Sequence, residues 1–396
     1  MTDALIFPSD FLWGTATAAH QIEGNNTNSD WWRFEHTPGS GCVDASGDAC
    51  DSWHRYEDDL DIVKELGLNS FRFSVEWARI EPARGEYSRA TLEHYRRVMG
   101  ACRDRGILPV VTLHHFTLPQ WVADAGGFEA PDIATWMGEY ATVVAEALGD
   151  LVGLACTINE PNIVAIMGYY FGIFPPQVRD WDRFVAVNET MRRCHVAMRD
   201  ALKAGPGDYP VGLTLSMTEY QAIEGGEERM LKSREEMEDA YLRSVADDDF
   251  LGVQCYSRTV FGPDGAVGET GETTDMGYAY WPQCVEHTVR RAAEVAGCPL
   301  VVTENGISGA NDERRIAYLD AALRGLHRAL DDGIDCRGYF QWSLLDNFEW
   351  VLGYTQKFGI VSVDRETMAR SPKPSADWFG TVARGNSLSS FAPSTN

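Results

Sequence analysis

The chain has 396 residues, 44% of them apolar, which is enough for one large α/β barrel or two ordinary domains. Acidic residues outnumber basic residues 59 to 34, and the resulting charge of −25 argues against nucleic-acid or membrane partners but is compatible with an uncharged small ligand. The start, MTDALIFPSDF, lacks the pattern of a signal peptide, and no run of about 18 apolar residues could span a bilayer. We therefore expect a cytoplasmic protein; the sequence is silent about its oligomeric state.

The nine cysteines are scattered along the chain and include no CxxC pair, which is typical of reduced thiols in a cytosol. Cys42 and Cys50 lie in one predicted loop and could pair under oxidation, but two free thiols explain them equally well.

Short apolar runs alternate with longer amphipathic runs along the whole chain. The apolar runs predict eight buried strands, at 11–16, 70–75, 107–113, 151–158, 210–217, 250–256, 299–305 and 336–342. Helical patterns lie between them, for example at 89–106, 182–205 and 312–333, with glycine at or near the C-cap. Eight alternations predict an α/β fold of the (β/α)₈ type, a TIM barrel. No linker divides the chain, so we assign residues 1–384 to a single barrel domain and 385–396 to a loose tail.

Two glutamates follow strands of this predicted barrel. The fourth strand ends in TINEPN, where Asn159, Glu160 and Pro161 are residues that a strand interior disfavours. The seventh strand ends in TENG and carries Glu304. Active sites of such barrels lie at the C-terminal ends of the strands, and strands four and seven are nearly opposite on a ring of eight. Glu160 and Glu304 are therefore expected to face each other across the barrel mouth.

A pair of opposed carboxylates is suited to glycoside cleavage, in which one donates a proton to the leaving oxygen and the other attacks or stabilises the anomeric carbon. A separation of ~5–5.5 Å gives retention of configuration and ~6.5–9.5 Å gives inversion. The sequence alone does not fix this separation.

The surroundings suggest which glutamate does what. Arg72, between two phenylalanines on the second strand, would hold Glu304 ionised if it points inward, and Tyr256 could donate a hydrogen bond to the same carboxylate. Glu160 has no obvious cationic neighbour, so a raised pKa suits it to the role of acid. Taken alone, Arg72 is explained equally well as a structural ion pair.

Flat apolar faces beside polar edges are what a sugar ring requires. WSLLDNFEW, after the eighth strand, supplies Trp342, Glu349 and Trp350, and the first and third strand ends add Gln21 and His115. Single tryptophans are usually core residues, so we expect packing roles for Trp13, Trp53 and Trp77, and a structural role for Glu76.

Six motifs in order, FLWGTATAAHQIEGN, FRFSVEWARIEP, LHHFTLPQW, TINEPN, TENG and WSLLDNFEWVLGYTQKFGIV, together resemble glycoside hydrolase family 1, the β-glucosidase family. The resemblance implies retaining hydrolysis of β-glycosides, with Glu160 as acid/base and Glu304 as nucleophile. It implies that Asn159 contacts the sugar 2-hydroxyl and that Arg72 and Tyr256 support the nucleophile. The glycone residues that it implies are Gln21, His115, Trp342, Glu349 and Trp350. We expect no cofactor and no metal.

The chain departs from the family pattern at several places. Gln254 and Cys255 precede Tyr256 where an Asn-Tyr run is usual, and Phe116 and Tyr278 stand where tryptophans are frequent. The stretch from Met217 to Phe250 is short and mostly acidic helix, from which we infer an open aglycone side. Glu349 and Trp350 occupy the position of a phosphate cradle, and a carboxylate would repel a 6-phosphate. We therefore expect an unphosphorylated glucoside, with fucosides and galactosides also compatible.

Three alternatives remain to be weighed. A metal-dependent barrel hydrolase could be imagined on His20, His54, His114, His115 and His195, but HxH and HExxH motifs are lacking and neighbouring His114 and His115 should face opposite sides of a strand. A sugar-binding protein without catalysis is disfavoured because both glutamates are present. A transglycosylase with the same machinery stays open.

Overall fold

The structure is a computed structural model that describes residues 4–389. Eight parallel strands form the barrel: β2 (Leu12–Ala16), β3 (Ser70–Ser74), β4 (Leu108–His114), β5 (Leu154–Asn159), β6 (Val211–Ala222), β7 (Phe250–Gly262), β9 (Leu300–Asn305) and β10 (Cys336–Trp342). Each strand pairs with the next one in the chain, and pairing of β10 with β2 closes the ring. The predicted (β/α)₈ barrel is thereby confirmed.

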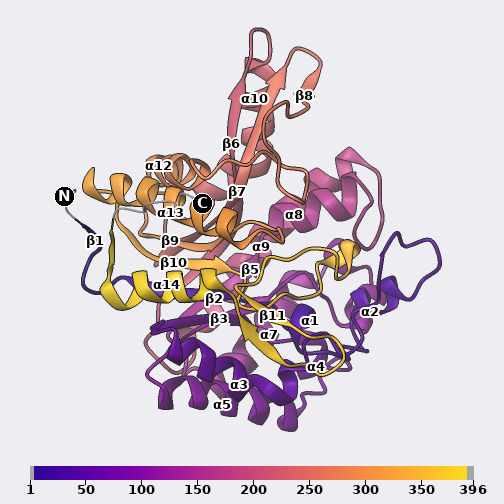
Figure 1. Cartoon of the computed structure of the whole chain (residues 1–396). Coiled ribbons are helices and arrows are strands. Elements are labelled where there is room, and N and C mark those ends of the chain that lie inside the picture. Colours follow the sequence, from indigo (N-terminus) through magenta and orange to yellow (C-terminus); the bar gives the residue numbers. More distant parts are fainter. Residues whose placement is uncertain (1–3, 390–396) are drawn as a thin grey trace.

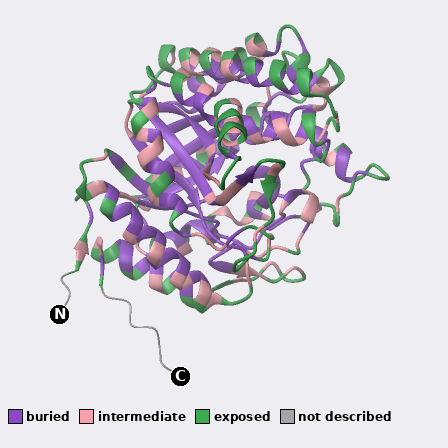
Figure 2. Ribbon diagram, turned by 90° about the horizontal axis from the view of Figure 1, so that it is seen from above, coloured by how far each residue is buried: buried purple, intermediate pink, exposed green. Residues whose placement is uncertain are grey.

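Helices surround the barrel and turn their apolar faces toward it. The longer ones are α3 (Ser52–Glu65), α5 (Arg89–Asp104), α7 (Ile133–Leu148), α9 (Trp181–Ala204), α12 (Cys284–Ala296), α13 (Asp312–Asp331) and α14 (Pro374–Gly385). In α5, Ser88 caps the first turn by accepting a hydrogen bond from Thr91 N (3.2 Å), and the buried residues Tyr95, Val98 and Cys102 recur at helical spacing. Figure 2 shows the result: buried residues fill the barrel and the inner faces of the helices, and exposed residues lie outside.

Shorter elements connect the barrel units. The helical turns are α1 (Ala19–Ile22), α2 (Asp30–Glu35), α4 (Trp77–Ile80), α6 (Gln120–Asp124), η1 (Gly127–Glu129), α8 (Pro161–Ala165), η2 (Ile166–Tyr170), α10 (Glu227–Arg234), η3 (Glu235–Asp239), α11 (Ala240–Ser244) and η4 (Trp350–Leu352). The small strands are β1 (Leu5–Ile6), β8 (Gly265–Val267), β11 (Val361–Val363), β12 (Arg370–Pro372) and β13 (Ser387–Leu388).

Strands β6 and β7 run further than the sequence predicts. The predicted strands ended at Met217 and Tyr256, whereas β6 and β7 stay paired to Ala222 and Phe261, with a register shift after Met217. Strand β8 then pairs with the end of β7. The sequence did not predict this extension because its residues are mostly polar, and both strands lose their pattern of buried residues there. The extension, with α10 beside it, projects beyond the barrel (Figure 1).

The two ends of the described chain are tied together. β1 pairs antiparallel with β13, and Asn386 accepts a hydrogen bond from Trp13 Nε1 (2.8 Å). The tail that we predicted from Gly385 is therefore paired as far as Leu388; its last residues, 390–396, lie outside the described part.

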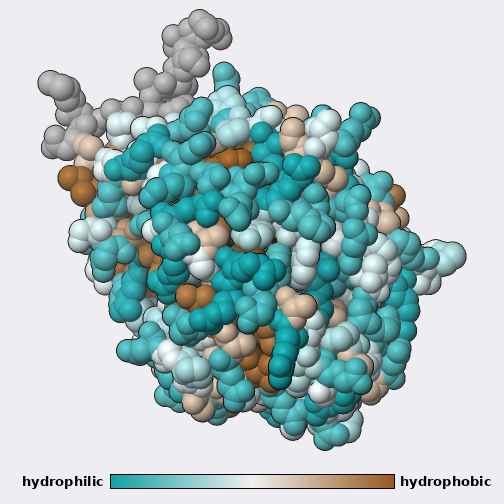
Figure 3. Space-filling view, turned by 90° about the horizontal axis from the view of Figure 1, so that it is seen from below, coloured by the Kyte–Doolittle hydropathy of each residue, from teal (hydrophilic) through white to brown (hydrophobic). Residues whose placement is uncertain are grey.

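The expected packing roles agree with the structure. Trp13 and Trp77 are fully buried, Trp53 packs against the core, and Glu76 caps α4 while accepting a hydrogen bond from Thr117. All nine cysteines lie within the described residues and are free. Between residues 4 and 389, no helix combines the length and the apolar character needed to cross a bilayer. The face shown in Figure 3 is mainly hydrophilic, in keeping with the large excess of acidic residues.

Candidate active site

Glu160 stands at the junction of β5 and α8. Pro161 occupies the first turn of α8, where its missing N–H is no disadvantage, and Glu160 is the N-cap residue with φ of +44°. Non-glycine residues seldom adopt this left-handed conformation, and they cluster at functional sites. The backbone N–H of Glu160 is fixed by the carbonyl of Thr214 (2.9 Å). The side chain is thus held at the end of the strand, as the sequence predicts.

Glu304, on β9, is held by Arg72 and Tyr256. Phe71 and Phe73 belong to the core outside the barrel, so alternation along β3 points Arg72 inward. Arg72 Nη1 donates to Glu304 Oε1 at 2.5 Å, and the Tyr256 hydroxyl donates to Oε2 at 2.5 Å. Both contacts were expected, and both are confirmed.

The two carboxyl groups differ in their electrostatic surroundings. Burial raises the pKa of Glu160 well above its usual range, and the negative charge of Glu304 raises it further. Burial also raises the pKa of Glu304, but Arg72 and the hydrogen bond from Tyr256 oppose this shift. Glu160 is therefore the carboxyl that holds a proton more tightly, which fits an acid at Glu160 and a nucleophile at Glu304.

Gln254 and Thr214 complete this polar layer. In the sheet, Gln254 pairs with Glu304 and Thr214 pairs with Asn159. Gln254 Nε2 donates to Asn159 Oδ1 at 3.1 Å, and Arg72 Nη2 donates to the same oxygen at 2.6 Å. Gln254, a departure from the family pattern, thus keeps a polar contact. Thr214 was missed, although its place between the apolar residues Leu213 and Leu215 of a predicted strand was a usable signal for an inward-facing polar side chain.

Four of the predicted sugar-binding residues carry a buried polar atom without a hydrogen-bond partner in the described chain. Among the buried side-chain atoms that lack a hydrogen-bond partner within residues 4–389 are Gln21 Oε1, His115 Nδ1, Asn159 Nδ2, Gln254 Oε1 and Glu349 Oε2. A buried polar atom without a partner is unfavourable, so these atoms suit a ligand rich in hydroxyl groups. Gln21 is itself fixed through Nε2, which donates to the carbonyl of Phe348 (2.8 Å) and to Asn347 (3.2 Å).

Aromatic rings surround the same position. The His115 ring lies stacked 6.0 Å from Trp342 and 6.1 Å from Trp350, and burial lowers the pKa of His115 well below its usual range. His115 is therefore a neutral hydrogen-bonding group. Phe116 packs on Trp350 with ring centroids 4.8 Å apart and so closes this wall with an apolar face. Burial, followed by the charge of Glu304, raises the pKa of Glu349 to about 8.

The histidines considered for a metal site are engaged elsewhere. His20 Nε2 lies 3.3 Å from Glu35, and His195 contacts Thr157 and Asp248. His114 packs edge-on to Phe128 (5.5 Å), away from the rings around His115, so the two neighbours do face different sides. Among residues 4–389, no group of three or more His, Cys, Asp or Glu side chains is arranged to hold a metal ion.

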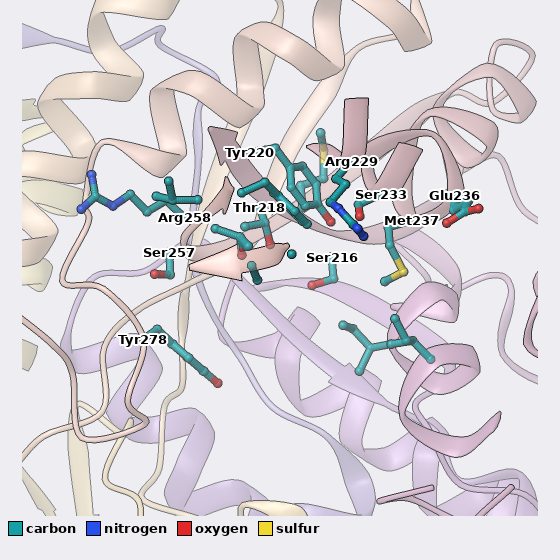
Figure 4. A pocket seen from close by; sticks show the side chains of 18 of the residues that line it. Ser216, Thr218, Tyr220, Arg229, Ser233, Glu236, Met237, Ser257, Arg258 and Tyr278 are labelled. Carbon is teal, nitrogen blue, oxygen red and sulfur yellow. The ribbon is translucent and has the colours of Figure 1, made fainter. Parts of the chain in front are cut away.

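A cavity of about 1010 Å³ opens beside the two glutamates. Ser216, whose side chain opposes the rise in the pKa of Glu160, and Tyr256, whose hydroxyl donates to Glu304, both line it. Figure 4 shows residues of β6, β7 and the helical turn η3 around this space, with Tyr278 at its edge. Tyr278 is 38% exposed, so a polar, partly exposed ring stands where the family frequently has tryptophan. The arrangement offers a polar pocket for one sugar and a wide opening for what is attached to it.

Comparison with known proteins agrees with this geometry. The family model described as glycosyl hydrolase family 1 matches residues 4–261 and 257–388. Beta-glucosidase A of Acetivibrio thermocellus is 34% identical across 96% of this chain and 99% of its own, and a bifunctional beta-D-glucosidase/beta-D-fucosidase of Bifidobacterium breve is 32% identical across 95% and 97%. Among solved structures, the family 1 β-glucosidase of Thermotoga maritima superposes with a TM-score of 0.93 at 30% identity, covering 98% of this chain and 100% of that one.

Proposed function

The chain belongs to glycosyl hydrolase family 1 and hydrolyses β-glucosides, and we propose that it does so with retention of configuration through a covalent glycosyl-enzyme. In this proposal Glu304 attacks C1, and Glu160 first donates a proton to the leaving oxygen and then accepts one from water. The observation that carries the proposal is that the two buried carboxylates differ in their hydrogen-bond partners and in how tightly each holds a proton. Arg72 and Tyr256 hold Glu304, whereas burial favours the protonated form of Glu160.

We assign the glycone site to the residues with unsatisfied polar atoms and to the aromatic rings around them. These residues are Gln21, His115, Asn159, Trp342, Glu349 and Trp350. The bifunctional relative named above supports β-fucosides as additional substrates. The free thiols support the cytoplasmic location that we also propose.

The stereochemical course tests the mechanism. Proton NMR recorded in the first minutes of aryl β-glucoside hydrolysis should show β-glucose as the first product, followed by slow mutarotation. An α-anomer formed first would contradict a retaining mechanism. Initial rates on aryl β-glucoside, β-fucoside, β-galactoside and 6-phospho-β-glucoside would then rank the glycones. We expect negligible turnover of the phosphorylated compound, because Glu349 and Trp350, neither of them cationic, stand where its phosphate would need positive charge.

A further inference from the structure

The cavity beside the glutamates is large for a second sugar unit. Drug-sized ligands occupy pockets of roughly 300–1,000 Å³, and this cavity, at about 1010 Å³, lies at the upper end of that range. It begins at Ser216 and Tyr256, so a leaving group protonated by Glu160 would extend directly into it. Its outer wall is the projecting extension of β6 and β7 with β8 (Figure 1).

The lining of this cavity is mainly apolar. Aliphatic and thioether side chains come from α8, η2 and η3, and aromatic side chains come from β6, β7 and α9. Representative members are Ile163, Met167, Met237, Tyr220, Phe261 and Trp181. Thioether side chains adapt to irregular apolar ligands, and aromatic rings supply large contact areas.

The charged groups of the cavity already have partners. Arg258 is bonded to Glu269 by contacts of 3.1 Å, and Arg229 Nε donates to the carbonyl of Pro263 at 2.6 Å. In Figure 4, Arg258 extends away from the side on which Glu236 and Met237 lie. The glycone residues Gln21, His115, Asn159 and Glu349, in contrast, carry buried polar atoms that lack partners within the described chain, and none of these residues lines the cavity. The two ends therefore differ in chemistry: hydroxyl groups suit one, and apolar surface suits the other.

Apolar side chains at the rim also remain exposed. Phe171 is 48% exposed, Trp181 37% and Val267 43%, and all three line the cavity. Apolar surface gathered at the mouth of a pocket typically marks a binding site. A substrate that covered these side chains would remove them from water.

We propose that the substrates of this enzyme carry a large apolar aglycone, multi-ring or long-chain in size, that is bound by contact with this cavity. This inference rests on the proposed function, because it assumes that Glu160 and Glu304 cleave the bond at the inner end of the cavity. It expects such aglycones to bind better than a second sugar, because apolar and aromatic side chains form most of the lining.

A series of n-alkyl β-D-glucosides from ethyl to decyl, used below their micelle concentrations, isolates the apolar contact because the basicity of the leaving alcohol hardly changes. We expect kcat/KM to rise by up to about fourfold for each methylene that becomes buried, and octyl glucoside to exceed cellobiose. A flat series, or cellobiose as the better substrate, would overturn the inference. Absence of hydrolysis of every glucoside, aryl glucosides included, would instead contradict the proposed function.

Substitutions at the rim test whether the cavity is the source of this preference. Phe171→Ala and Trp181→Ala should each lower the octyl-to-ethyl ratio of kcat/KM by roughly fivefold or more, in keeping with the loss of a large apolar contact. Val185→Ala is the matched control: Val185 lies one turn from Trp181 on α9, is 46% exposed and does not line the cavity. Circular dichroism melting curves would establish that each variant is folded. An unchanged ratio in both folded rim variants would overturn the assignment.

Discussion

Arg72 and Glu304 are 232 residues apart in sequence, yet Nη1 of the first lies 2.5 Å from Oε1 of the second inside the barrel. Both side chains are almost completely buried. A buried ion pair of this kind is weak evidence for stability, because desolvation offsets much of the attraction. Its value here is positional: it orients one carboxylate and leaves Glu160 as the group that takes up a proton.

The two glutamates should respond differently to an added anion. With 2,4-dinitrophenyl β-glucoside, Glu160→Ala in azide should yield β-glucosyl azide, because azide intercepts a glycosyl-enzyme formed by Glu304. Glu304→Ala should yield α-glucosyl azide, because azide then enters on the face that the nucleophile occupied. Without azide, Glu160→Ala should lose roughly 10²- to 10⁴-fold on substrates with poor leaving groups. NMR of the two azides is the measurement, and exchanged products would reverse the assigned roles.

Tyr256→Phe removes the hydroxyl that bonds Glu304. A hydrogen bond to a charged group contributes about 1.5–3 kcal/mol, so kcat/KM should fall roughly 10- to 100-fold. Because this bond lowers the pKa of Glu304, its loss should raise that pKa and move the acidic limb of the pH profile to higher pH. Tyr209→Phe is the control, since the Tyr209 hydroxyl is buried without a partner in the described chain. An acidic limb that stayed in place would contradict the contact.

Glu238 predicts a pH dependence of stability. Burial raises its pKa from 4.5 to about 8, so the folded state binds more protons than the unfolded state between these values. Stability must then fall as the pH rises through this window. Glu23, with a pKa of about 7, acts in the same direction. The melting temperature should decrease from pH 6.5 to pH 8, above the range in which histidines of lowered pKa such as His94 act in the opposite direction, and Glu238→Gln should flatten the decrease.

The matched variant for this measurement is Glu227→Gln. Glu227 lies on α10 and is exposed, so its neutralisation should leave the slope of melting temperature against pH unchanged. A steeper slope in Glu238→Gln than in the unmodified chain would contradict the raised pKa.

Replacement by alanine should have opposite effects on stability at two glycines, Gly212 and Gly100. A Cβ at Gly212, in β6, would lie 2.0 Å from the backbone carbonyl of Phe250, and a strand backbone cannot move away. Overpacking of a core usually costs about 1–3 kcal/mol. Gly212→Ala should therefore lower the free energy of unfolding by about 3 kcal/mol or more. Gly100, inside α5, has nothing within 4 Å, so Gly100→Ala should stabilise by about 0.5–1 kcal/mol. Denaturant unfolding measures both, and similar midpoints for the two would contradict this reading.

Most of the site could be predicted because its residues sit at strand ends or in short motifs with a recognisable chemistry. The strand-breaking residues after β5 placed Glu160, whereas Arg72 was singled out as a cation between two phenylalanines of a predicted strand and its inward direction came from the structure. The extension of β6 and β7 could not be predicted, because its half-exposed strands have no apolar period, and their pairing is fixed by contacts between segments about 40 residues apart. An open aglycone side was inferred from the short stretch between Met217 and Phe250, but the residues that line the cavity were not, because they come from separate elements that share no local sequence pattern.

The pairing of Leu5 with Leu388 has a practical consequence. Asn386 also bonds Trp13, near the beginning of β2, so both ends of the described chain leave the barrel at the N-terminal ends of its strands. The glutamates lie at the opposite ends of the strands. A fusion partner or surface linker attached at either terminus would accordingly emerge behind the catalytic opening and leave the path of incoming molecules clear.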